Sequence, residues 1–140
     1  MAKTEKEIQG DVIRLLKGSL LADSVSGKVY RNGYRPRDSK AEDIIVTHTA
    51  GLPGQIETGL VTVNVFYPDI DPYDNGVYVE DGQRGEDLQD LARLWVETLN
   101  DNALGYLFTL NQSIRSMEET ALTPPQHFVV IALNYQYHQL

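Results

Sequence analysis

Apolar side chains recur at helical spacing near the start of the chain. They follow Thr4-Glu5-Lys6-Glu7, a sequence typical of a capping box, in which the Thr4 and Glu7 side chains accept reciprocal bonds from backbone N–H groups. The apolar positions are Ile8, Val12, Leu15 and Leu16. This spacing predicts an amphipathic helix over about residues 5–21.

A second helical stripe lies in the later half of the chain. Glu86 and Asp87 precede it, where the positive end of the helix dipole favours anions. The stripe consists of Leu88, Leu91, Ala92, Trp95, Val96 and Leu99. It is wide enough to pack on a sheet, so these side chains are predicted to belong to the core.

Between the two helices the apolar period changes to two. Residues 43–49 are rich in β-branched side chains, residues 51–54 carry turn residues, and residues 56–67 give the strongest strand pattern in the sequence. One face of that strand carries Val61, Val63, Val65 and Tyr67. Pro68 is expected to end the strand because proline cannot donate to a sheet ladder.

Two further strands are predicted after the second helix, over residues 107–119 and 127–137, joined through Thr123-Pro124-Pro125. The order of elements is therefore α–β–β–α–β–β. This order predicts a single α+β domain over residues 1–140, with a mainly antiparallel four-stranded sheet packed by two helices.

Charge is divided unevenly along the chain. Residues 1–40 hold nine of the twelve Lys and Arg residues but only five carboxylates, whereas the other hundred residues hold three Arg and fifteen Asp or Glu. One molecule thus carries a basic and an acidic region, which favours head-to-tail contact between identical copies. The alternative is that both regions are ordinary solvated surface.

The basic region contains a segment, residues 27–40, that we name the basic arm. Its cations alternate with Tyr30 and Tyr34, and they are Lys28, Arg31, Arg35, Arg37 and Lys40. Such alternation can stack on bases and bind phosphates. The positive excess is small and no RNA-binding motif accompanies it, so contact with a partner protein is favoured.

Composition excludes several classes of function. The chain has no cysteine, which removes disulfides, thiolate nucleophiles and Cys-based metal centres. It has no apolar run of bilayer length and no apolar stretch of the signal-peptide kind at the start, so a cytoplasmic location without membrane contact is expected. The overall acidity argues against broad nucleic-acid binding.

No catalytic signature is present, and neither a cofactor nor a metal is expected. A metal-dependent enzyme remains an alternative, built on Asp43, Glu57 and the histidines His48, His127 and His138, which lie on different predicted strands. The Asp-rich segment at residues 69–84 loosely follows a calcium loop, but Pro72 interrupts the ligand spacing. A solvated acidic loop is the favoured interpretation.

The order of elements and three sequence features together resemble the tail-terminator, or tail-completion, proteins of long-tailed bacteriophages and prophages. The sequence features are Gly33-Tyr34-Arg35-Pro36 after the first helix, the strand that ends in Val65-Phe66-Tyr67-Pro68, and the closing aromatic strand at residues 131–137. The resemblance implies a structural protein, not an enzyme, that forms a hexameric ring on the finished tail tube. Such a ring stops tube growth and provides the surface for head attachment. Another head–tail connector or neck protein is the nearest alternative.

The resemblance also implies the partners: further copies of the chain, the tail tube protein and a head–tail connector protein, with DNA only as passing cargo. The expected locations are the host cytoplasm during assembly and then the virion tail. We expect the basic arm of one copy to face the acidic loop of the next. The candidate interface residues are Arg31, Tyr34, Arg35, Arg37, Asp69, Asp71, Asp74, Glu80 and Asp81.

Overall fold

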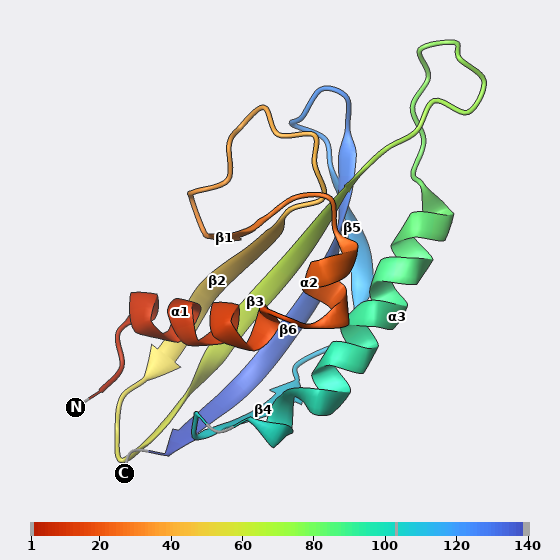
Figure 1. The fold of residues 1–140 in the computed structure, drawn as a ribbon. Helices are drawn as coiled ribbons and strands as arrows, with labels where there is room; N and C mark the ends of the chain where they lie inside the picture. Colours follow the sequence, from red (N-terminus) through yellow and green to blue (C-terminus); the bar gives the residue numbers. More distant parts are fainter. Residues whose placement is uncertain (1, 103, 139–140) are drawn as a thin grey trace.

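The computed structural model describes residues 2–102 and 104–138. The chain forms an α+β fold in which three α-helices lie on one face of a six-stranded sheet (Figure 1). The elements are α1 (Glu5–Leu16), α2 (Leu20–Ser24), β1 (Val29–Arg31), β2 (Ile44–Leu52), β3 (Ile56–Pro68), α3 (Gly82–Thr98), the 3₁₀ turn η1 (Leu99–Asp101), β4 (Tyr106–Leu110), β5 (Arg115–Glu119) and β6 (Gln126–His138).

The sheet has six strands, which corrects the expected four, and it is mixed, although it is mainly antiparallel as expected. Its order is β1-β2-β3-β6-β4, and β5 pairs with β6 beside β4. β1 runs parallel to β2, while the other pairs are antiparallel. β1 lies inside the basic arm, which the sequence pattern had not predicted to contain a strand. It is held there because the Asp43 carboxylate accepts a hydrogen bond from the Lys28 N–H.

The strand predicted over residues 107–119 is two strands. β4 pairs with the end of β6 and β5 with its beginning, so one thirteen-residue strand serves both. The break falls at the polar residues 111–113, where the Asn111 N–H still donates to the Ala132 carbonyl. Asn, Gln and Ser have weak strand preference, which accounts for the position of the break.

The first helix is also shorter than predicted. α1 ends at Leu16, Lys17 is extended, and Gly18 adopts a φ of 78° that favours glycine. Ser19 then caps α2, because its hydroxyl accepts from the Ala22 N–H at 3.1 Å. The capping box at Thr4 and Glu7 is confirmed.

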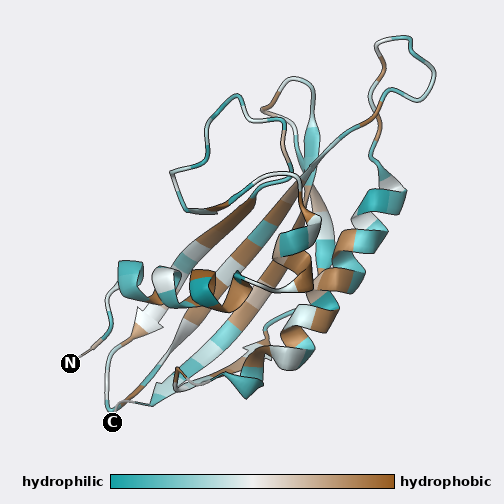
Figure 2. Ribbon diagram, in the orientation of Figure 1, coloured by the Kyte–Doolittle hydropathy of each residue, from teal (hydrophilic) through white to brown (hydrophobic). Residues whose placement is uncertain are grey.

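The core lies between the helices and the inner face of the sheet. Hydrophobic and polar residues alternate along the central strands (Figure 2), as the period of two predicted. Val61, Val63, Val65 and Tyr67 are fully buried on the inner face. Trp95 joins α3 to α1, since its indole N–H donates to the Leu15 carbonyl at 3.1 Å.

Candidate functional site

The basic arm and the acidic loop, residues 69–81, lie on opposite flanks of the molecule. The arm lies beside the β1 edge, at the upper left of Figure 1, while the acidic loop projects from the upper right beyond the start of α3. A contact between one molecule's loop and another molecule's arm would join two different surfaces and so allows a head-to-tail arrangement, which forms a ring when the rotation between copies closes.

The base of the acidic loop is fixed by side chains from both of its ends. His127 Nδ1 lies 2.6 Å from the buried Asp69 carboxylate, and His127 Nε2 lies 3.8 Å from Glu80. The Tyr67 hydroxyl donates to Glu80 at 2.6 Å. Burial and this carboxylate together raise the pKa of Tyr67, so its hydroxyl stays protonated and keeps donating. Asp69 and Glu80 thus hold the loop in place.

Hydrogen bonds to backbone groups also hold the part of the loop beyond its base. Ile70 and Val79 exchange two N–H···O bonds of 2.9 Å, and the Asp71 carboxylate accepts from the Asn75 and Gly76 N–H groups. Asp71 therefore shapes the turn.

The tip of the loop is exposed and apolar as well as acidic. Tyr73 is 83% exposed and Val77 60%. Asp74 has a φ of 52°, and its carboxylate has no partner among the described residues. Asp81, at the loop's end, caps α3 by accepting from the Arg84 N–H. Of the candidate interface carboxylates in this loop, Asp74 is thus the most available to another molecule.

On the opposite flank, the Arg35 side chain is engaged in contacts within its own chain. Its Nε lies 2.8 Å from the buried Asp43 carboxylate, and its Nη2 donates to the Gln126 side-chain oxygen at 2.9 Å. The guanidinium also stacks 4.2 Å from the centre of the Phe66 ring. These contacts give Arg35 a structural role within its own chain, and its expected role in a contact between copies stays a prediction.

Arg31, Tyr34 and Arg37 remain accessible to different degrees. Arg37 is exposed, and Tyr34 is 62% exposed with Lys6 Nζ lying 5.6 Å from its ring centre. Arg31 is half-buried against α1. Its Nε is buried with no partner among the described residues, and Nη2 makes one long 3.5 Å bond to the Lys6 carbonyl.

Sequence reasoning missed two cations of α1 that join Arg31. A hollow of about 360 Å³ between α1 and β1 is lined by Lys3, Lys6, Glu7, Gly10, Asp11, Arg14 and Arg31. We name it the cationic hollow. The signal was present in the sequence, because Lys6, Gly10 and Arg14 are four residues apart and so share one helix face.

The residues of the metal-enzyme alternative are dispersed. Asp43 binds Arg35, buried Glu57 accepts from the Lys3 N–H, and His48 contacts the Tyr135 hydroxyl at 3.0 Å. His127 lies at the base of the acidic loop, and His138 is exposed at the end of β6. Within residues 2–102 and 104–138, no three His, Asp or Glu side chains are arranged to hold a metal ion.

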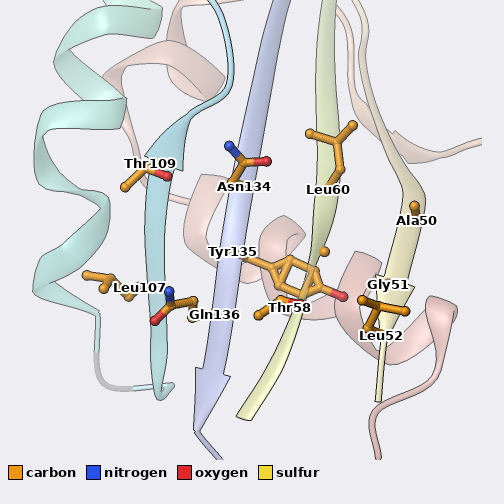
Figure 3. A pocket seen from close by; sticks show the side chains of 11 residues that line it. Ala50, Gly51, Leu52, Thr58, Leu60, Leu107, Thr109, Asn134, Tyr135 and Gln136 are labelled. Carbon is orange, nitrogen blue, oxygen red and sulfur yellow. The ribbon is translucent and has the colours of Figure 1, made fainter. Parts of the chain in front are cut away.

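The outer face of the sheet, which no helix covers, carries a second hollow of about 450 Å³ (Figure 3). Leu52, Leu60 and Leu107 give it apolar walls, and Asn134 and Gln136 contribute amides. Its one titratable lining group is Tyr135, whose pKa is raised by burial and by Glu57. This chemistry suits the binding of an apolar side chain.

No protein-family model matches the chain, and the search of curated proteins returned no match. Among the described residues, no helix combines the length and apolar character needed to cross a bilayer.

Proposed function

We propose that this protein is a phage or prophage tail terminator, a structural subunit that forms a hexameric ring on the tail tube, stops its polymerisation and provides the head-attachment surface. The sequence resemblance supplies the class. The structural observation that supports it is the placement of exposed opposite charge on opposite flanks of one chain. In this proposal the subunit acts by binding, without a catalysed reaction.

Ring closure requires more than ion pairs. Exposed pairs contribute about 0 to 1 kcal/mol each, so apolar contact must supply most of the association energy. The exposed Tyr73 and Val77 of the acidic loop and the leucines of the outer hollow offer such area. An acidic lumen would let DNA pass without adhering, because like charges repel.

The proposed partners are further copies of the chain, the tail tube protein and a head–tail connector. We place the subunit in the host cytoplasm during assembly and in the virion tail afterwards. The test is electron microscopy of the purified protein mixed with purified tail tubes and free tube subunits. A terminator binds one end of each tube and blocks further growth.

Binding along the tube walls, or tubes that continue to grow at both ends, would overturn the proposal. Binding to isolated connectors with no effect on tubes would instead identify a neck protein, the nearest alternative. Light scattering on the same samples measures whether rings form in solution or only on the tube.

A further inference from the structure

We propose that the cationic hollow between α1 and β1 receives the tip of the acidic loop, Tyr73 and Asp74, from a second copy of this chain. This inference deepens the proposed function, since it names the surfaces that join neighbouring subunits. The contact proposed here uses Arg31 and residues of α1 in place of Arg35.

The charges around the hollow favour an incoming carboxylate. Four cations and two carboxylates line it, and one of the pairs is internal: Lys3 Nζ lies 2.6 Å from Asp11. Glu7 is engaged in the capping box. Arg14 is 69% exposed in its side chain and only 3.5 Å from Asp11 at its nearest nitrogen, which leaves most of its donors facing outward.

Arg31 provides a more specific reason. A guanidinium has five N–H donors, but among the described residues the Arg31 side chain makes a single long hydrogen bond, to the Lys6 carbonyl. Its Nε is buried, and no acceptor for it lies within residues 2–102 and 104–138. A buried cationic group with unpaired donors costs free energy unless a nearby negative charge compensates it. An anion beside Arg31 would therefore stabilise the assembled state more than the free subunit.

The loop tip has the complementary features. The Asp74 carboxylate has no partner within the described residues, and Tyr73 beside it is the most exposed large hydrophobic side chain of the loop. In the assembled state Asp74 lies against Arg31 and Arg14. Tyr73 packs on the rim formed by Tyr34 and Lys6, which already stack 5.6 Å apart.

The absence of cysteine from the chain makes the contact directly testable. A Pro72→Cys variant places a thiol on the exposed loop without removing Tyr73 or Asp74, and an Asn32→Cys variant places one beside Arg31 on the exposed turn after β1. The two variants are mixed and treated with a short bismaleimide. The matched control replaces Asn32→Cys with Glu97→Cys, which is exposed on α3.

We expect a cross-linked dimer of the two variants at about tenfold higher yield than in the control mixture. Adding Asp74→Arg to the loop variant should remove that excess, whereas adding Asp101→Arg, an equal charge change at η1, should preserve it. Equal yields in test and control mixtures, or insensitivity to Asp74→Arg, would overturn the inference.

The same samples separate this inference from the proposed function. Tubes that are capped by protein lacking the Pro72–Asn32 cross-link would retain the terminator proposal and reject this contact. A cross-link without capping would support the contact and reject the terminator. Cross-linking of the Asn32→Cys variant to the tube protein in place of a second copy would assign the hollow to the tube and overturn the inference.

Discussion

The Arg35 guanidinium and the Asp43 carboxylate form a buried ion pair, 2.8 Å apart, that ties the basic arm to the start of β2. Only 9% of the Arg35 side chain and 2% of the Asp43 side chain are exposed. The pair also reaches Gln126 at the start of β6, so it connects three segments that are distant in sequence.

Removing one partner of this pair should be strongly destabilising. We expect Arg35→Met to lower the free energy of unfolding by about 3 kcal/mol, because Asp43 would keep a buried charge without its cation. Arg37→Met, two residues away and exposed, is the matched control and should change stability by less than about 0.5 kcal/mol. Urea unfolding measures both, and equal losses would contradict the assigned roles.

Acid should weaken the same interaction. Burial alone would raise the pKa of Asp43, but hydrogen bonds from Arg35, Ser39 and the Lys28 N–H together hold the pKa below its ordinary value of 3.8. The unfolded chain therefore takes up this proton first as the pH falls. The stabilisation is complete above the ordinary pKa and is lost as the pH falls through the lower, folded pKa.

Asp43→Asn tests this dependence. The variant should be less stable than the parent at about pH 6, and the difference should shrink as the pH falls below about 4, because the unfolded parent then binds a proton that the folded parent binds only at lower pH. Unfolding curves recorded across this range give the comparison. A difference that stays constant with pH would exclude Asp43 as the titrating group.

Trp95 should be the most sensitive position of α3. It is 4% exposed and donates to the Leu15 carbonyl, so Trp95→Ala removes both packing and a bond between helices. We expect a loss of about 3 to 5 kcal/mol. Trp95→Phe should cost less, about 1 to 3 kcal/mol, for the lost hydrogen bond and the smaller ring. Leu94→Ala, at a neighbouring position that is 44% exposed, is the control for α3 and should cost less than Trp95→Ala.

Gly18 tests the break between α1 and α2. Its φ of 78° costs an L-residue about 1 kcal/mol, so Gly18→Ala should destabilise the protein by that amount. Gly82→Ala should have the opposite sign, because Gly82 begins α3, has open space around it and gains helix propensity. Thermal unfolding compares the two variants, and a stabilising Gly18→Ala would show that the break can be closed.

Local patterns were sufficient to predict the parts of the fold that depend on neighbouring residues. The capping box at Thr4 and the buried face from Val61 to Tyr67 follow from spacing alone, and both are confirmed. The sequence pattern did not predict β1, because a strand of three residues is too short to show an alternation of apolar and polar positions. Its pairing depends on the hydrogen bond from the Lys28 N–H to Asp43, fifteen residues later. The split between β4 and β5 likewise depends on the length of β6.

Part of the candidate site could likewise be predicted from the sequence, and part depended on the fold. The two charged regions were visible in composition, but burial decides which charges are available to a partner. Arg35 and Arg37 are equivalent in the sequence, and only the fold separates the buried ion pair from the exposed cation. The contribution of α1 was missed because Lys6 and Arg14 reach Arg31 through packing, and no periodicity of the basic arm includes them.

The hydrogen bonds that join His127 to Asp69 and Tyr67 to Glu80 fix the base of the projecting loop. The base of the loop is therefore already ordered in the free subunit. Its conformational entropy is lost when the chain folds and is not lost again when another subunit binds. In the proposed ring, a small contact area at the tip then suffices for recognition, and each newly added subunit takes its orientation from the one before it.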